Sequence, residues 1–256
     1  MSKSWVSVFL LIVIPSSFGI ASSSAAEGEP ELISLYKYKP MYFIMGNPYT
    51  KIQVSFKARL SKNIPIYFAY SQLMFWNLFI SSPYFHDINY DPLLFYRFMI
   101  DHEKDQWIDV IPWEHESNGK GGELERAWDR FAVMYNVSHR LGEKSRLHWS
   151  IKAWIPIRYN PNNKDLADYR GLWELNLTLQ DFLGDFFAFD DVIFRLYPGG
   201  ESQLDPFRGG QELTLRSSFH RTKFLPMIVG QIFHGFGESL LDYTEERWGF
   251  RIGAGF

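Results

Sequence analysis

Apolar and polar residues alternate with a period of two through most of this chain, and this limits the fold to sheets. From Ile52 to Leu60 the even positions are apolar and the odd positions are polar or charged. Segments 149–158, 174–180 and 248–256 separate in the same way, and the pattern places Arg158 on the polar face of its segment. Successive side chains of a strand point to opposite faces, so each segment predicts a strand with one apolar and one polar face.

Two all-β architectures fit this pattern. A soluble β-sandwich buries its apolar faces between two sheets, whereas a transmembrane barrel turns them outward and keeps its polar faces inside. Aromatic residues reach 18% and charged residues 21%, which suits either architecture. The alternation alone therefore leaves both open.

Three further features favour the barrel. Segments of about 10 residues suit a tilted membrane crossing better than the usual soluble strand. There are twelve of them, an even number as in bacterial single-chain barrels, and the chain stops on Phe256 at the end of an alternating aromatic strand. The segments are 32–45, 51–61, 65–78, 92–101, 106–117, 126–138, 146–158, 169–182, 186–197, 210–220, 224–236 and 246–256. We predict a twelve-stranded antiparallel transmembrane β-barrel, with inward charges paired in a plugged lumen.

The first 26 residues have the features of a secretory signal peptide. Lys3 gives a basic start, Val6 to Ile14 is apolar, and Ser24-Ala25-Ala26 resembles a cleavage site. The apolar run is shorter than the roughly 20 residues of a membrane helix. Since no linker or composition shift follows, we expect residues 27–256 to form a single barrel domain.

Charge and cysteine content narrow the function. The chain has no cysteine, so its fold uses no disulfide, although an exported compartment would permit one. Loss of Lys3 with the signal leaves 25 basic against 29 acidic residues, a net charge of −4. The chain has no cluster of basic residues to follow a phosphate backbone, which argues against a nucleic-acid partner.

His115 and Ser117 stand two apart on a predicted strand and therefore share a face. Gly119 to Gly122 predict a turn, and the returning strand can place Asp129 beside His115. A nucleophile, a base and an orienting carboxylate from one hairpin form the triad of a serine hydrolase. Taken alone, the same residues also fit a polar hairpin loop.

Four stretches make the chain resemble the outer-membrane phospholipase A family of Gram-negative bacteria. They are Tyr70-Ser-Gln72 with Trp76; Ser81-Ser82-Pro83 leading to Asn89-Tyr90-Asp91-Pro92; His115 to Asp129; and Gly235-Phe-Gly237-Glu238-Ser239-Leu-Leu-Asp242-Tyr243. They occur in the family's order along essentially the whole mature chain. The resemblance implies a twelve-stranded barrel in the outer membrane, crossing it many times, that hydrolyses phospholipid esters.

The resemblance also implies the catalytic residues. Ser117 stands at the family's nucleophile, His115 at its general base, and the backbone N–H of Gly119 at an oxyanion donor. Asp129 takes the place of the family's usual asparagine. Aspartate is a common histidine-orienting residue, so the substitution suits the same chemistry.

A calcium requirement follows from the resemblance, with ligands that match the family less closely. The carbonyl of Lys120 corresponds to a family ligand, and Glu125 replaces a serine ligand with a hard carboxylate oxygen. Main-chain oxygen at Ser81 of a second subunit would complete this site. Asp165 matches one aspartate of a second family site, while Gly122 stands where the other is expected.

The resemblance implies a homodimer that acts on membrane phospholipids. Gln72 shares a strand face with Tyr70, Met74 and Trp76, and an amide facing lipid is costly unless it is paired. The family buries the matching glutamine between subunits. The expected function is calcium-dependent phospholipase A1/A2 and lysophospholipase activity, and the alternative is a non-catalytic barrel, a pore or structural protein with a decayed site.

Overall fold

The computed structural model describes residues 35–181, 190–218 and 227–256, and consists almost entirely of strands. The expected signal peptide, residues 1–26, lies outside the described residues. The strands are β1 (Leu35–Lys37), β2 (Tyr42–Asn47), β3 (Thr50–Arg59), β4 (Ile66–Asn77), β5 (Tyr84–Asp101), β6 (Gln106–Ser117), β7 (Ala127–Arg140), β8 (Arg146–Tyr159), β9 (Trp173–Gln180), β10 (Asp191–Gly199), β11 (Asp205–Ser217), β12 (Met227–Gly235) and β13 (Arg247–Gly255).

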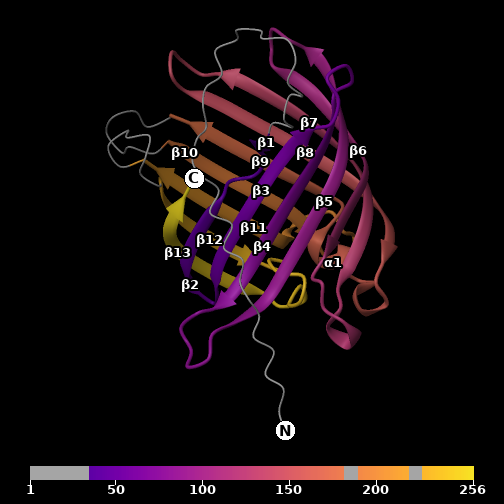
Figure 1. The fold of residues 1–256 in the computed structure, drawn as a ribbon, viewed down its shortest axis with the longest axis vertical. Coiled ribbons are helices and arrows are strands. Elements are labelled where there is room, and N and C mark those ends of the chain that lie inside the picture. Colours follow the sequence, from indigo (N-terminus) through magenta and orange to yellow (C-terminus); the bar gives the residue numbers. More distant parts are fainter. Residues whose placement is uncertain (1–34, 182–189, 219–226) are drawn as a thin grey trace, which may run out of the picture. The chain divides into compact units, whose positions relative to one another are not determined.

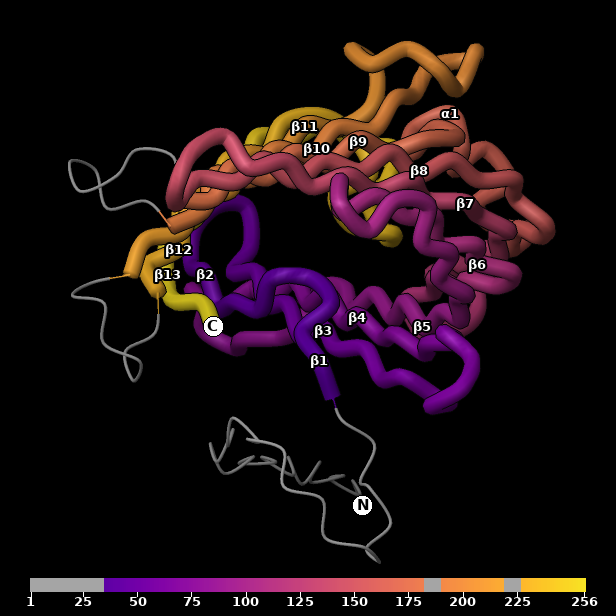
Figure 2. Tube along the Cα trace, turned by 90° about the horizontal axis from the view of Figure 1, so that it is seen from above, coloured from indigo at the N-terminus to yellow at the C-terminus, as the bar shows by residue number. Residues whose placement is uncertain are grey.

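Antiparallel pairing closes the sheet on itself. Each strand from β4 to β13 pairs with the next, β13 pairs with β2, and β3 pairs with both β2 and β4. Strands β1 and β2 pair with successive parts of β3, Leu35 opposite Ala58 and Tyr42 opposite Gln53, so they are two parts of one strand. The predicted twelve-stranded antiparallel barrel is confirmed. Figures 1 and 2 show the strands in this order, from β3 and β4 round to β12 and β13.

Most predicted strand ranges are close to those in the structure, and three strands begin elsewhere than predicted. Strand β5 begins at Tyr84, eight residues before the predicted start at 92, and β11 begins at Asp205, five residues before the predicted start at 210. The strand expected from residue 169 begins at Trp173. The residues before Trp173 form the short helices η2 (Pro161–Asn163) and α1 (Ala167–Arg170). The ends predicted over 182–189 and 219–226 fall outside the described residues. No helix of the described chain is long and apolar enough to cross a membrane.

Apolar side chains cover the outer faces of the strands. Ile155 and Ile252 remain 68% and 64% exposed, while the inward neighbours Trp154 and Arg251 are buried. Other exposed apolar residues on the barrel are Val54, Trp113, Phe131, Val133, Ile151, Ile157, Ile228, Ile232, Trp248 and Phe250. An apolar outside around a polar inside is the arrangement of a transmembrane barrel.

Paired charges fill the lumen. Lys51, whose side chain is 2% exposed, donates to Glu212 at 2.6 Å and to Glu238 at 3.1 Å. Arg251 holds Glu238 through both terminal nitrogens, at 2.7 and 2.9 Å. Further inward pairs are Asp91 with Lys39, Asp109 with Arg97, Glu114 with Lys152 and Arg130, Glu174 with Arg195, and Asp191 with Arg216. The predicted pairing of inward charges is confirmed for Glu174, Arg216 and Arg251. A lumen filled in this way leaves little room for a conducting channel.

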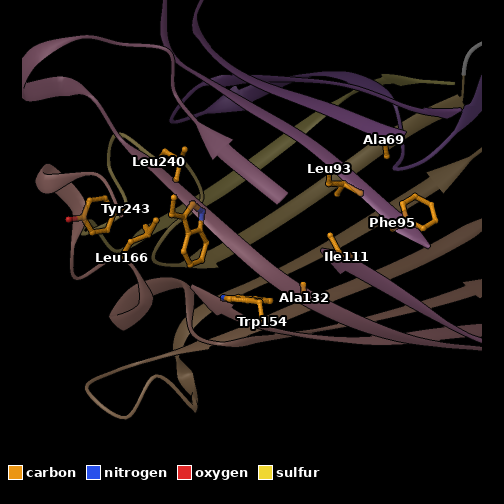
Figure 3. Close-up of a cluster of buried hydrophobic side chains, with 10 residues drawn as sticks. Ala69, Leu93, Phe95, Ile111, Ala132, Trp154, Leu166, Leu240 and Tyr243 are labelled. Carbon is orange, nitrogen blue, oxygen red and sulfur yellow. The ribbon is translucent and has the colours of Figure 1, made fainter. Parts of the chain in front are cut away.

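The loop 236–246, between β12 and β13, folds into one end of the barrel. The amides of Leu240 and Leu241 donate to Asn89 and Asp87, which project inward from β5. Leu240 packs with Trp154 and with the loop residues Leu166 and Tyr243, in a buried cluster that extends along the strands (Figure 3). Because neighbouring strands are antiparallel, this loop lies at the same end as the β6–β7 and β8–β9 loops, which carry the candidate site.

Candidate active site

Strand register brings the predicted triad residues together on β6 and β7. His115 lies directly opposite Asp129, and Ser117 directly opposite Ala127. Glu114 and Glu116 alternate with them and are buried among the lumen charges, so His115 and Ser117 project from the outer face. The hairpin therefore presents these side chains to the outside of the barrel.

His115 is held by a short hydrogen bond and an aromatic neighbour. Its Nδ1 lies 2.7 Å from Oδ1 of Asp129, which is 8% exposed. The Trp113 ring stacks on the imidazole at 6.2 Å between centroids. When the carboxylate accepts the Nδ1 proton, the neutral ring keeps Nε2 as a free proton acceptor. This is the orientation that a general base requires.

A cavity of about 330 Å³ contains these side chains and the loop that follows them. Its lining residues are His115, Ser117, Gly119, Lys120, Glu125, Ala127, Trp128, Asp129, Arg158, Tyr159, Asn160 and Pro161. Within the described residues, no hydrogen bond joins the Ser117 hydroxyl to His115. Such contacts are often long in free enzymes and tighten when substrate binds.

The loop 118–126 is shaped by Asn118, a residue that the sequence reasoning overlooked. Its buried side chain donates to the carbonyl of Leu124 at 2.9 Å and accepts from the amides of Lys120 at 3.3 Å and Arg126 at 3.0 Å. One side chain thus ties the beginning of the loop to its end. Asparagine after a strand and before glycines is a turn signal that could have indicated this role.

Gly119 adopts a left-handed conformation, with φ at +62°. A Cβ atom here would lie 2.8 Å from the ring of Tyr90, whose β5 position is opposite Ser117. Glycine is therefore favoured by both the backbone and the close ring. Among the described residues its N–H has no acceptor, so it remains available to an oxyanion.

Arg158 is the second residue that the sequence reasoning missed, and its expected face was wrong. Asp129 pairs with Arg158 and Arg130 with Pro156, so β8 has one extra residue between them. This bulge moves Arg158 from the predicted polar inner face to the outer face beside Asp129. Its Nε donates to Oδ2 of Asp129 at 2.7 Å. Proline inside a predicted strand is a known sign of a bulge, and Pro156 could have indicated it.

Of the four expected calcium ligands, two line the cavity and two lie elsewhere. Lys120 and Glu125 line the cavity with Ser117, and the Glu125 carboxylate makes no hydrogen bond to any described residue. A free carboxylate and a loop carbonyl are hard oxygen donors that fit calcium, so these residues could hold part of its shell. No group of three His, Cys, Asp or Glu side chains in the described ranges could bind a metal by itself.

Asp165 and Ser81 do not line this cavity. Asp165 accepts a hydrogen bond from the Tyr243 hydroxyl at 2.5 Å. Burial, together with this hydrogen bond, raises the pKa of Tyr243. Ser81 lies exposed in the β4–β5 loop, next to Phe79 and Ile80, whose side chains are also exposed. Asp165 therefore has a structural partner in this chain, and Ser81 is open to another molecule.

Neighbouring loops support the loop 118–126. Asn163, fully buried, binds both backbone groups of Ala127, and Asn162 donates to the carbonyl of Gly122 at 2.8 Å. The Asp165–Tyr243 contact joins this second loop to the inward-folded loop 236–246. The candidate site thus rests on three loops from the same end of the barrel.

Gln72 lies on the outer face of β4 and is partly satisfied within the chain. Its Oε1 accepts from the Tyr70 hydroxyl at 2.8 Å. Its amide NH2 group makes no hydrogen bond within the described ranges. An outward amide with free donors favours a polar partner on that face.

The fold and the site define a β-barrel with an Asp–His–Ser arrangement on its outer surface. A family model described as Phospholipase A1 matches residues 41–256. The chain belongs to this phospholipase A1 family, which confirms the resemblance found in the sequence.

Related proteins and structures agree with this assignment. The chain is 29% identical to Phospholipase A1 of Escherichia coli K12 over 192 residues, 73% of this chain and 60% of that protein. It is 25% identical to a putative phospholipase A1 of Neisseria meningitidis over 229 residues, 81% of this chain and 54% of that protein. The chain thus spans less than two thirds of the length of these relatives.

Two solved structures share the fold. Outer membrane phospholipase A from Escherichia coli has a TM-score of 0.73 at 21% identity, covering 90% of this chain and 94% of that one. The calcium-bound outer membrane phospholipase dimer of Salmonella typhi has a TM-score of 0.71 at 22% identity, covering 87% and 92%. At 21–22% identity, the similarity to these structures shows that the barrel fold is shared.

Proposed function

We propose that this protein hydrolyses the acyl esters of glycerophospholipids in the outer membrane, with Ser117 as the nucleophile. The observation that carries the proposal is the outward-facing cavity in which Asp129 orients His115 beside Ser117. Phospholipase A1 relatives and the family match support the substrate class. Both acyl positions, and lysophospholipids, present the same ester to the site.

The residues of the cavity suit acyl transfer through a covalent intermediate. Ser117 Oγ attacks the ester carbonyl while Nε2 of His115 accepts its proton, and Asp129 stabilises the imidazolium that forms. The N–H of Gly119 donates to the carbonyl oxygen as it becomes negative. His115 then gives its proton to the leaving glycerol oxygen and later activates the water that releases the fatty acid.

Calcium is proposed as the cofactor, held by the Lys120 carbonyl and the Glu125 carboxylate. A bound calcium ion supplies positive charge that stabilises the oxyanion. The two residues line the same cavity as Ser117, and the Salmonella typhi structure is a dimer with bound calcium. Ser81 of a second copy of this chain is the proposed further ligand, and Asp165 would take part only after releasing Tyr243.

The outer surface supports membrane localisation and dimerisation. The exposed apolar residues surround the barrel, and Phe131 and Val133 continue this surface from Asp129 along β7. Acyl chains of membrane lipids can therefore reach the cavity from the side. We propose that a second barrel packs on the Gln72 face and binds its free amide donors.

Hydrolysis should depend on calcium. Refolded protein in detergent micelles is expected to release fatty acid from phosphatidylcholine in millimolar calcium and to lose this activity in chelator. Glu125→Ala should raise the calcium concentration needed and weaken calcium binding measured by calorimetry, because one charged ligand is removed. Glu123→Ala, in the same loop and outside the cavity lining, is the matched control. Equal activity in calcium and chelator would remove the metal from the mechanism.

Asp129 variants test the departure from the family's asparagine. Asp129→Asn should reduce kcat by roughly tenfold, because its amide oxygen can accept from His115 while its NH2 faces the Nε–H of Arg158. Asp129→Ala should reduce kcat by about 10³-fold, since the ring loses its orienting acceptor. Steady-state rates on phosphatidylcholine distinguish the cases. Similar losses in both variants would make the charge essential, and no loss in either would exclude Asp129 from the triad.

A further inference from the structure

Arg158 occupies a position that the catalytic triad does not by itself require. The bulge before it places its side chain on the outer face of β8, where it is 73% exposed. Its Nε donates to Oδ2 of Asp129, while the other oxygen of that carboxylate binds His115. The hydrogen bond from Nε to Asp129 therefore fixes the position of the guanidinium at one nitrogen.

The two terminal nitrogens of Arg158 are free. A guanidinium has five N–H donors, of which the Asp129 contact uses one. The Nη1 and Nη2 atoms make no hydrogen bond to any residue in the described ranges, and Arg158 lines the cavity that contains Ser117. Four donors on a fixed cation thus remain available to a ligand beside the nucleophile.

The spacing suits a phospholipid whose ester lies at Ser117. Strands β6 and β8 flank β7, with Ser117 opposite Ala127 and Arg158 opposite Asp129. Adjacent strands lie about 4.8 Å apart and two residues along a strand add about 7 Å, so the backbones of Ser117 and Arg158 are roughly 12 Å apart. The Arg158 side chain on one side and the glycerol backbone of the lipid on the other can span this distance. A planar guanidinium with paired donors matches the oxygens of a phosphate.

We propose that Arg158 is a specificity-determining residue that binds the phosphate of the glycerophospholipid through Nη1 and Nη2 while its Nε holds Asp129. This inference rests on the proposed function, since it assumes that the ester is cleaved at Ser117. The Lys120 ammonium is the other cation of the cavity, but it makes no hydrogen bond that fixes it within the described ranges. The anchored guanidinium is the better preorganised phosphate site.

The experiment compares two esters with identical acyl chains, phosphatidylcholine and diacylglycerol, in the same mixed micelles at fixed calcium. The full-length refolded protein and Arg158→Gln are measured for kcat/KM on each. Arg158→Gln is expected to reduce phosphatidylcholine hydrolysis at least about tenfold more than diacylglycerol hydrolysis, because only the first substrate loses a charged hydrogen-bond partner. Arg158→Lys keeps the charge and should retain part of the preference.

Two matched variants define the other outcomes. The first is Lys120→Gln, which removes the other cation of the cavity. The second is Arg140→Gln, which changes an exposed arginine at the far end of β7. Whatever their effect on absolute rates, both variants should leave the ratio of kcat/KM for phosphatidylcholine to kcat/KM for diacylglycerol unchanged. Equal losses on both substrates in Arg158→Gln would show that Arg158 only positions Asp129 and would overturn the proposal, as would a changed ratio in Lys120→Gln alone. Failure of the proposed function is a separate result, because Ser117→Ala would then still cleave both esters.

Discussion

Ser117→Ala is expected to abolish phospholipid hydrolysis, with a loss of about 10⁴-fold or more in kcat. The hydroxyl is the atom that forms the acyl intermediate, and no other serine or threonine lines its cavity among the described residues. The side chain projects from the outer face at the end of β6, so its removal leaves the inward ion pairs intact. Fatty-acid release measured at saturating calcium provides the rate.

A matched control separates lost chemistry from lost folding. Ser138→Ala removes the same hydroxyl from β7, close to the opposite end of the strand, and should keep wild-type activity. Circular dichroism should show the same strand content in both variants. Hydrolysis near the wild-type rate in a folded Ser117→Ala protein would contradict the assignment of Ser117 as the nucleophile.

Lys51→Met should give a large loss of stability. Its ammonium is nearly fully buried and pairs with Glu212 and Glu238, so the substitution leaves buried carboxylates short of a partner. Breaking a buried pair in this way costs about 3–5 kcal/mol. Urea unfolding in detergent, followed by tryptophan fluorescence, measures the change.

Two comparisons make this test specific. Lys104→Met breaks an exposed pair with Asp101, at 3.4 Å, and should leave the unfolding midpoint nearly unchanged. Adding Glu212→Gln to Lys51→Met should recover part of the stability, because one unpaired charge is removed. An unfolding midpoint for Lys51→Met equal to that of Lys104→Met would show that the lumen network contributes little.

The strands were predictable because the two sides of the barrel wall differ in polarity. Ile52 to Leu60 alternates cleanly, and the structure forms β3 over Thr50–Arg59. The start of β5 was missed because Ser81-Ser82-Pro83 and the polar residues Asp87 and Asn89 suggest a loop. The side chains of Asp87 and Asn89 point inward and bind the loop 236–246, a contact between distant parts of the sequence.

The candidate site was predictable in its hairpin and less so in its surroundings. His115 and Asp129 meet because their register follows from a short loop between two strands. Arg158 was missed because a bulge of one residue exchanges the faces of a strand. Contacts between loops, such as that of Asp165 with Tyr243, depend on closure of the whole barrel and leave no local pattern in the sequence.

The most direct test of the account is the site of covalent labelling by an alkyl sulfonyl fluoride. Refolded protein in calcium is treated with the reagent, digested and analysed by mass spectrometry. The account predicts one adduct, on Ser117, formed in step with the loss of hydrolysis and strongly slowed by His115→Ala, since the base that activates the serine is gone. Complete inactivation with the adduct on another residue, or full labelling of Ser117 with hydrolysis unchanged, would contradict it.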